Sequence, residues 1–379
     1  MRCPVAGVVA LSLTLAVVLL IAPPGRVAAQ GATWTPLGLQ RANLFALIAD
    51  PASPGMLYAG GAYREGAPTS TLYSNFFRSS DSGNTWQRAI LDQDVGAVLA
   101  LAVAPPAQPT LLYATGPFGV SVSRDRGTTW LTATELNSGH QMLVDPEVAS
   151  SLYLAAPDAV YMSPDAATTW RRLTVAPKPC DFRTLAFASA TPRALYAGGG
   201  CGVFESQDRG TTWQQLAAAP TNVVTLTADP ADPMRIYAGS VDPPPIGGLW
   251  QSGDGGRSWE RLEAGKRVDV VLIDPRDPRT IFVAGSGPTD VLWSRDRGAT
   301  WSPLGDRAPS HGIVALVVMG DRLVAAGYGG VWQMAIPAAA GSMPMLPGTG
   351  AGGCHDLQCP GFPAQRAGGE GDCSGRYDR

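Results

Sequence analysis

The segment SRDRGTTW at residues 123–130 contains the pattern Ser-x-Asp-x-Gly-x-Thr-Trp, which recurs along the chain. We call this pattern the repeat motif. Six copies are present; one has Ser in place of Thr, another has Ala167 at the Gly position, and a truncated copy ends at Trp34. The Asp and Trp residues of the six copies are Asp81 and Trp86, Asp125 and Trp130, Asp165 and Trp170, Asp208 and Trp213, Asp254 and Trp259, and Asp296 and Trp301.

The spacing of the copies indicates the architecture. Consecutive Trp residues, starting from Trp34, are separated by 52, 44, 40, 43, 46 and 42 residues, a period typical of four-stranded propeller blades. Between motifs, most units contain an apolar run ending at Asp-Pro, a run built on a Leu/Ile–Tyr/Phe pair, and a third run leading into the motif. Short runs bounded by Gly, Pro and Asp read as strands, and no convincing helical period follows residue 30.

The ends of the repeat give the blade number. Six full units run from about Asn43 to Leu304, and a seventh, from His311 to Ile336, supplies only three strands. The fragment Ala32–Leu37 has the sequence of a fourth strand without a unit before it. If it completes the seventh unit, the ring closes without an unpaired edge. The sequence therefore predicts an all-β, seven-bladed β-propeller of four-stranded antiparallel blades, closed by the N-terminal strand.

Composition excludes several classes of protein. Gly and Pro make up about a fifth of the 379 residues, which argues against a helical bundle or coiled coil. The net charge is −3 and no basic run is present, so we expect no nucleic-acid partner. Hydrophobic residues reach 45%, too many for a wholly disordered chain.

The N-terminal residues predict export. Arg2 precedes an apolar run from Val5 to Ala22, and small residues stand before Gln30, where a signal peptidase would cut. Retention of the run as a membrane anchor is the alternative. We favour cleavage, and therefore expect no membrane span in the mature chain and a secreted or cell-envelope location.

Three segments are therefore expected: a signal peptide at 1–29, the propeller at 30–336, and a disordered tail at 337–379 that is rich in Gly, Ala and Pro. The tail contains Leu-Pro-Gly-Thr-Gly at 346–350, a sequence like the sortase signal for cell-wall attachment. A working signal needs a following apolar span and a basic end. Residues 351–379 supply neither, so a functional wall anchor is not expected.

The repeat motif has a structural explanation that needs no ligand. In a hairpin turn the Asp side chain accepts bonds from nearby main-chain N–H groups, and the Gly adopts positive φ. Ala tolerates positive φ poorly, so we expect the turn at Ala167 to be strained or altered. Six calcium or sugar sites are the alternative, which we disfavour because one acidic side chain per loop is a poor cage for a hard cation.

The motif resembles the Asp-box, or bacterial neuraminidase repeat. Six copies at blade spacing are specific for that superfamily of propellers, which includes sialidases, xyloglucan hydrolases, the sortilin ectodomain and the photosystem II stability and assembly factors. The resemblance covers nearly all of residues 31–336. It implies that the motif is a structural turn on the side away from the usual binding face. In size the chain is most similar to single seven-bladed members, whose role is binding another protein.

Enzymatic relatives fit less well. Sialidases carry Arg-Ile-Pro ahead of the first motif, but none of Arg41, Arg64 and Arg78 is followed by Ile-Pro, so sialidase activity is disfavoured. Xyloglucan hydrolases place two propellers around a cleft and use a carboxylate pair, and this chain has one propeller. We expect no catalytic residue, cofactor or metal site, since no nucleophile triad, ligand cluster or phosphate loop is evident.

Candidate binding residues lie in loops at the start of the first strands, where propellers usually bind ligands. His140, Arg183, Asp269 and His311 are expected to ring the mouth of the central channel. Ordinary polar loop residues are the alternative. A long loop at 61–71 adds Tyr63 and Arg64, again as candidate binding residues.

Of the six cysteines, Cys180 and Cys201 fall on the same predicted face, and an exported protein could join them in a disulfide. Two isolated buried thiols are the alternative. Cys354, Cys359 and Cys373 lie in the tail with spacings that match zinc sites poorly.

Two functions remain possible for a chain with these features. The first is an exported binding or assembly propeller, expected to be a monomer, that recognises an unidentified protein or carbohydrate through its loop face. The second is a glycoside hydrolase that uses two of the carboxylates available on that face, which belong to Asp92, Asp94, Asp242, Asp269 and Asp290. Two carboxyl groups at roughly 5–10 Å across a groove would favour the enzyme.

Overall fold

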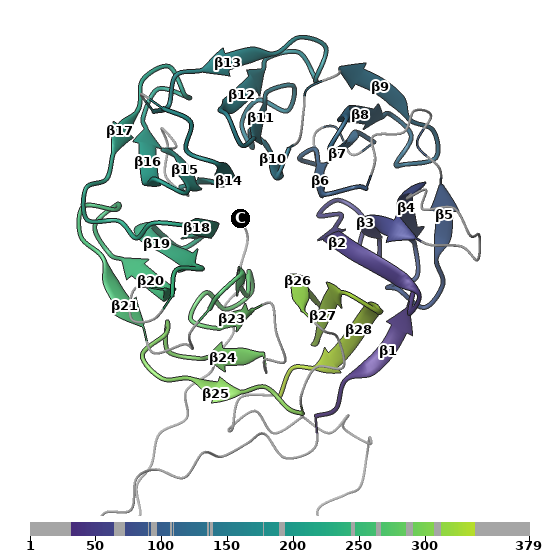
Figure 1. Cartoon of the computed structure of the whole chain (residues 1–379). Coiled ribbons are helices and arrows are strands. Elements are labelled where there is room, and N and C mark those ends of the chain that lie inside the picture. The colour runs from purple at the N-terminus through teal and green to yellow at the C-terminus, as the bar shows by residue number, and fades with distance from the viewer. Residues whose placement is uncertain are drawn as a thin grey trace, which may run out of the picture. The chain divides into compact units, whose positions relative to one another are not determined.

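The computed structural model of this chain is a ring of seven four-stranded antiparallel sheets (Figure 1). It describes residues 32–63, 73–89, 91, 97–106, 108, 110–134, 136, 139–176, 178–188, 194–243, 247–262, 267–285, 291–306 and 312–337. These ranges contain no helix, and so none able to cross a membrane. Met1–Pro337 and Ala338–Arg379 fall into two separate units, and every described residue belongs to the first. The prediction of a seven-bladed all-β propeller is confirmed.

Six blades are formed by consecutive strands, which follow one another from the innermost strand outward. Blade 1 contains β2 (Ala42–Ala49), β3 (Leu57–Tyr63), β4 (Tyr73–Ser79) and β5 (Gln87–Ala89), and blade 2 contains β6 (Ala100–Val103), β7 (Leu112–Gly116), β8 (Gly119–Ser123) and β9 (Leu131–Thr134). Blade 3 contains β10 (Gln141–Val144), β11 (Leu152–Ala155), β12 (Val160–Ser163) and β13 (Arg171–Leu173), and blade 4 contains β14 (Phe182–Phe187), β15 (Leu195–Gly199), β16 (Gly202–Ser206) and β17 (Gln214–Gln215). Blade 5 contains β18 (Val223–Asp229), β19 (Asp232–Ser240), β20 (Gly248–Ser252) and β21 (Glu260–Leu262), and blade 6 contains β22 (Val270–Ile273), β23 (Ile281–Ala284), β24 (Leu292–Ser294) and β25 (Ser302–Pro303).

The seventh blade joins the two ends of the propeller. Its three inner strands are β26 (Ile313–Met319), β27 (Arg322–Gly327) and β28 (Gly330–Ala335), and its outer strand is β1 (Thr35–Gly38). β1 pairs antiparallel with β28, with Thr35 opposite Gln333. The neighbouring Trp34 is only 9% exposed in a core cluster that also contains Met334. The predicted closure is therefore confirmed, and the chain leaves no blade with a missing strand.

The repeat motif forms the same turn in all six copies, between the third and fourth strands of blades 1 to 6. In blade 4, the Ser206 hydroxyl donates to Asp208 Oδ1 at 2.9 Å and accepts the Gly210 N–H at 2.7 Å. The Thr212 N–H and hydroxyl donate to the two Asp208 oxygens at 2.7 Å each. The corresponding bonds recur in the other five copies. Each carboxylate thus stabilises its own turn through charge-assisted bonds.

The copy with Ala167 keeps this turn unaltered. The Ala167 N–H donates to Ser163 Oγ at 2.9 Å, and the Asp165 oxygens accept the same bonds as elsewhere. Ala166 and Ala167 have φ angles of 57° and 68°, in the region where a Cβ is disfavoured. The turn at Ala167 was expected to be either strained or altered. The positive φ angles show the strain, and the hydrogen bonds show that the turn is not altered.

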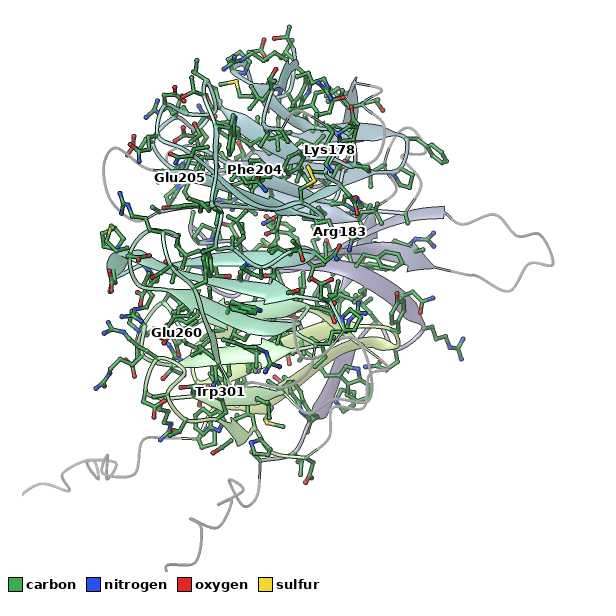
Figure 2. The ribbon with its side chains drawn as sticks, turned by 60° about the vertical axis from the view of Figure 1, so that its left-hand side comes forward. Lys178, Arg183, Phe204, Glu205, Glu260 and Trp301 are labelled. Carbon is green, nitrogen blue, oxygen red and sulfur yellow. A yellow bond between two sulfur atoms is a disulfide. The ribbon has the colours of Figure 1, made fainter. Side chains whose placement is uncertain are left out.

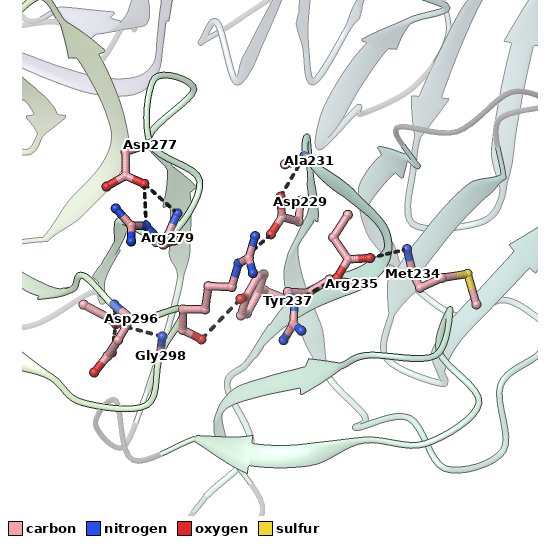
Figure 3. Close-up of polar contacts among 12 residues, drawn as sticks. Asp229, Ala231, Met234, Arg235, Tyr237, Asp277, Arg279, Asp296 and Gly298 are labelled. Carbon is pink, nitrogen blue, oxygen red and sulfur yellow. Dashed lines mark hydrogen bonds and ion pairs between the residues drawn. The ribbon is translucent and has the colours of Figure 1, made fainter.

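Contacts between the motif turns and the preceding blade link neighbouring blades. Asp229 at the end of β18 is fully buried and lies 3.6 Å from Nε of Arg297, which belongs to the motif turn of blade 6 (Figure 3). The Tyr237 hydroxyl donates to the Arg297 carbonyl at 3.3 Å, and burial raises the pKa of Tyr237 to about 12, so it stays a donor. Asp145 and Tyr153 of blade 3 contact Arg209 in the same way. The repeat pattern does not reveal this linkage, because its partners lie in different units of the sequence.

The motif carboxylates should make folding stability depend on acid. Hydrogen bonds from Thr85, Thr212 and Ser258 hold the pKa values of Asp81, Asp208 and Asp254 at about 2, below the ordinary 3.8. A carboxyl whose pKa is lower in the folded state contributes stability above the unfolded pKa, and this contribution disappears as the pH falls through the folded pKa. We expect the urea midpoint to fall between about pH 4 and pH 2, since the carboxylates of these three turns become protonated as the pH approaches their folded pKa.

The variant Asp208→Asn measures one share of this dependence. It should be less stable than the parent at pH 6, and its urea midpoint should fall less steeply from pH 4 to pH 2, because one titrating group is absent. Asp158→Asn, at a position outside the motif, is the matched control. An unchanged slope in Asp208→Asn would show that the motif carboxylates do not govern acid unfolding.

Candidate binding face

The innermost strands of all seven blades surround the propeller axis (Figure 1) and line a cavity of about 260 Å³. The cavity lies nearer the start of these strands. The repeat-motif turns lie at the opposite end, because the first and third strands of an antiparallel blade run in the same direction. In Figure 2, Arg183 lies toward one side of the ring, whereas Glu260 and Trp301, which follow or end motif turns, lie toward the other. We call the side with the cavity the channel face.

Apolar residues make up two thirds of the lining, but polar atoms provide more of the exposed surface of the wall than apolar atoms do. Every blade contributes at least two residues to the wall. The apolar lining residues are Phe45, Ala46, Leu47, Ile48, Leu99, Ala100, Leu101, Met142, Val224, Val270, Val314 and Ala315, and the polar ones are His140, Gln141, Arg183, Thr184, Thr225 and Asp269. Binding sites usually combine apolar side chains with convergent polar groups, and this cavity has both.

β-Bulges direct four of these side chains into the cavity. The pairing of an inner strand with its neighbour skips one residue at the same place in β2, β14, β18 and β26. The skipped residues are Phe45, Arg183, Val224 and Val314, and all four line the cavity. A bulge leaves one residue without a pairing partner and changes the direction of its side chain, and bulges are common beside functional sites. The repetition in four blades indicates that the cavity wall is a built feature.

Side chains also fix the inner strands to one another. Gln141 of blade 3 accepts the Leu185 N–H of blade 4 at 2.7 Å, and Thr184 accepts the Leu226 N–H of blade 5 at 2.9 Å. The Thr227 hydroxyl of blade 5 donates to the Val271 carbonyl of blade 6 at 3.0 Å. The wall is therefore held rigid across three blade boundaries, which favours a pre-formed site.

Charged groups stand in pairs at the mouth. Asp181 accepts from Arg183 at 2.7 Å and 2.5 Å and lies 3.3 Å from Nε2 of His140. Arg267 donates three hydrogen bonds of 2.9–3.1 Å to the two Asp269 oxygens, and these bonds raise the pKa of the Arg267 guanidinium. The rim of the cavity therefore presents both signs of charge.

The aromatic part of the mouth lies on blades 1 and 7. Phe45 meets Tyr328, in the β27–β28 turn, edge-on at a centroid distance of 6.1 Å. Tyr328 is 42% exposed, and Phe118 in the β7–β8 turn is 64% exposed. Turns between second and third strands reach the channel face, so two of the most exposed large hydrophobic side chains among the described residues lie on it.

The structure brings together three of the six residues selected from the sequence, because His140, Arg183 and Asp269 line one cavity. Tyr63 ends β3, and nothing is described of its side chain; Arg64 and His311 lie outside the described residues. Sequence reasoning missed Phe45, Tyr328, Asp181 and Arg267. Of these, only Asp181 and Arg267 lay within loops already assigned to this face.

Carboxylates on the channel face are engaged by neighbours. Asp242 accepts from the Thr221 hydroxyl at 2.6 Å and from the Asn222 amide, while Asp181 and Asp269 pair with arginines. Asp92, Asp94 and Asp290 lie outside the described residues. Among the described residues, no three His, Cys, Asp or Glu side chains are grouped as metal ligands would be.

Cys180 and Cys201 form a disulfide, with an S–S distance of 2.07 Å. It connects the segment entering β14 to the turn between β15 and β16, on the channel face. The structure therefore has a disulfide at these positions and not two isolated thiols.

Comparison with known proteins shows the fold alone. No protein-family model matches the sequence, and no curated protein matches it. Solved structures similar to this chain include YCF48 bound to a D1 peptide, with 15% identity, a TM-score of 0.60, and coverage of 81% of this chain and 97% of that one. Sqt1 from Chaetomium thermophilum has 13% identity and a TM-score of 0.56, covering 81% and 100%.

A GH74 xyloglucanase from Xanthomonas campestris is also similar, with 16% identity and a TM-score of 0.55 over 78% of this chain. This chain covers only 59% of the xyloglucanase. The chain thus shares a propeller fold with proteins that bind peptides and with glycoside hydrolases.

Proposed function

We propose that this chain is a binding propeller that recognises a protein partner through its channel face. The observation that carries the proposal is the cavity into which bulges in four blades direct Phe45, Arg183, Val224 and Val314. The apolar side chains of its lining can contact an anchoring side chain of a bound segment, since buried apolar anchors supply most of the energy of interfaces. The exposed Tyr328 and Phe118 extend the contact area beyond the mouth.

The paired rim charges support a peptide as the bound segment. Arg183 and Arg267 retain donors, and Asp181 retains acceptor capacity, so the rim can bond both peptide C=O and N–H groups. The cavity of about 260 Å³ has room for a side chain of a bound segment. We infer that one apolar residue enters the channel while the flanking backbone lies on the rim.

The proposal includes membership of the Asp-box propellers and an extracytoplasmic location. The six motif turns with one bonding scheme support the first. The Cys180–Cys201 disulfide supports the second, since disulfides persist in oxidising compartments.

Peptide selection tests this function. We expect random peptides displayed on phage and selected on the immobilised protein to converge on sequences with one apolar anchor. Ala315→Phe should fill the cavity. It should lower the affinity for a selected synthetic peptide, measured by calorimetry, by about tenfold or more, the loss expected for a blocked anchor. Ala299→Phe, at an exposed position in the motif turn of blade 6, should bind as the parent does.

Two results would overturn the proposal. The first is equal binding by both variants, which would place the peptide outside the cavity. The second is hydrolysis of a polysaccharide that Asp269→Asn abolishes, which would support the glycoside hydrolase function instead.

A further inference from the structure

Asp181 has an unusual backbone conformation at the mouth of the cavity. It directly precedes β14 and has a φ of 46°, in the left-handed region that residues other than glycine seldom occupy. Such conformations persist only where the surroundings enforce them, and they concentrate at functional sites. The contacts that enforce this one are therefore informative.

Three features hold the Asp181 backbone. Its N–H donates to the Pro157 carbonyl of the preceding blade at 2.9 Å, and the Gly200 N–H donates to the adjoining Cys180 carbonyl at 2.6 Å. The disulfide ties Cys180, which is only 4% exposed, to Cys201. A Cβ at Gly199 would lie 2.6 Å from the Asp181 carbonyl oxygen, so glycine permits this close approach.

The Asp181 carboxylate acts on residues of two blades. It accepts two bonds from Arg183, the bulge residue of β14, and lies 3.3 Å from His140, which directly precedes β10. Both partners line the cavity. The long arginine side chain has many alternative rotamers when nothing fixes it. The position of the carboxylate thus determines where the Arg183 side chain points, and it places a negative charge beside the His140 ring.

We propose that Asp181 is the positioning residue of the cavity rim and that the Cys180–Cys201 disulfide holds it in place. A role of Asp181 in binding rests on the proposed function. The contacts of Asp181 with the rim and with the disulfide do not depend on that function. Cleavage of the disulfide should leave the propeller folded, since the blade pairing does not pass through it. It should release Arg183 from its fixed orientation and change the distance between the Asp181 carboxylate and the His140 ring.

Nuclear magnetic resonance of the full chain tests this without a ligand. The sequence has only three histidines, so the ring signals of His140 are readily assigned with His140→Gln. Asp181→Asn removes the charge and keeps a residue that tolerates positive φ. It should shift the His140 ring signals and the Arg183 Nε–H signal. The double variant Cys180→Ser/Cys201→Ser, which keeps the carboxylate, should shift the same signals.

Asp158→Asn is the matched control, because Asp158 bonds Tyr161 and Arg172, neither of which lines the cavity. It should leave both signals in place. Unchanged signals in Asp181→Asn would overturn the positioning role. A shift in Asp181→Asn alone, with the folded double-serine variant unchanged, would overturn the role of the disulfide.

A selected peptide gives the functional readout. Asp181→Asn should lower the affinity for the selected peptide by about tenfold, the effect of one charge-assisted hydrogen bond. Asp158→Asn should leave this affinity unchanged. Equal affinity for Asp181→Asn and the parent, together with shifted signals, would overturn the relevance of the rim to binding. Failure to select any peptide would count against the proposed function and leave the spectroscopic result standing.

Discussion

Replacing Leu37 by alanine is expected to lower the free energy of unfolding by about 2–5 kcal/mol, the usual cost of removing a buried leucine side chain. Leu37 lies in β1 and is 5% exposed. It packs across a blade boundary, since a Cβ on Gly83 of blade 1 would lie 2.5 Å from its Cδ2. The loss therefore affects both the core of the closing blade and its contact with the next one.

Leu173→Ala is the matched control for this prediction. Leu173 occupies the same position in β13, three residues after the motif Trp, is 3% exposed, and approaches Gly210 of the next blade. Because β1 acts as an ordinary fourth strand, both variants should lose similar stability in urea titrations followed by tryptophan fluorescence. A loss for Leu37→Ala below half of that for Leu173→Ala would show that the ring does not depend on closure by β1.

The fold was predictable because its determinants are local. Each turn is specified within eight residues, so the motif located the third and fourth strands of six blades, and the Trp spacing located the repeat. The unpaired fragment around Trp34 predicted closure, since an edge strand without a partner is unfavourable. These inferences needed no knowledge of which side chains face one another across blades.

The binding face was only partly predictable, for a physical reason. Side chains alternate along a strand, and one inserted residue reverses which of them face the channel. The bulges at Phe45 and Arg183 have no clear sequence signal, so the lining of the cavity could not be predicted from the pattern. The contact of Asp181 with His140 likewise depends on how two blades are set against each other.

Contacts between the motif turn and the preceding blade follow one steric pattern at most blade boundaries, and this pattern accounts for the exceptional Ala167. At the boundary of blades 1 and 2, where the Leu position holds Ala89, Phe76 lies against the motif Gly127 instead. In four blade pairs, a Leu three residues after the motif Trp lies against the motif Gly of the next blade, where a Cβ would approach it within 2.4–2.8 Å. In blade 2 the residue three after the motif Trp is Ala133, which the pairing of β8 with β9 skips and which packs against the buried cluster that contains Ala167. The four Leu–Gly pairs are Leu37 with Gly83, Leu173 with Gly210, Leu216 with Gly256, and Leu262 with Gly298.

A smaller residue at 133 therefore leaves the room that the Ala167 methyl group fills. Ala133→Leu alone should destabilise the chain by about 1–3 kcal/mol, because the added side chain would overlap that methyl group. Ala167→Gly alone should change stability by about 1 kcal/mol or less, since relief of the positive φ offsets the lost methyl contact. The double variant should recover most of the loss, giving a coupling energy of about 1–3 kcal/mol in a double-mutant cycle.

The reverse exchange in blades 3 and 4 tests whether the rule is general. Gly210→Ala should be destabilising by more than Ala133→Leu, because it adds both a clash with Leu173 and a side chain at a φ of 84°. Adding Leu173→Ala should remove the clash but not the backbone strain, so recovery should be partial. Additive losses in both cycles would mean that the Leu–Gly and Ala–Ala pairs do not interact. The presence of Ala167 would then be unrelated to the size of residue 133. Coupling in both cycles would instead show that the sizes of residues 133 and 173 determine which residue the next motif can accept.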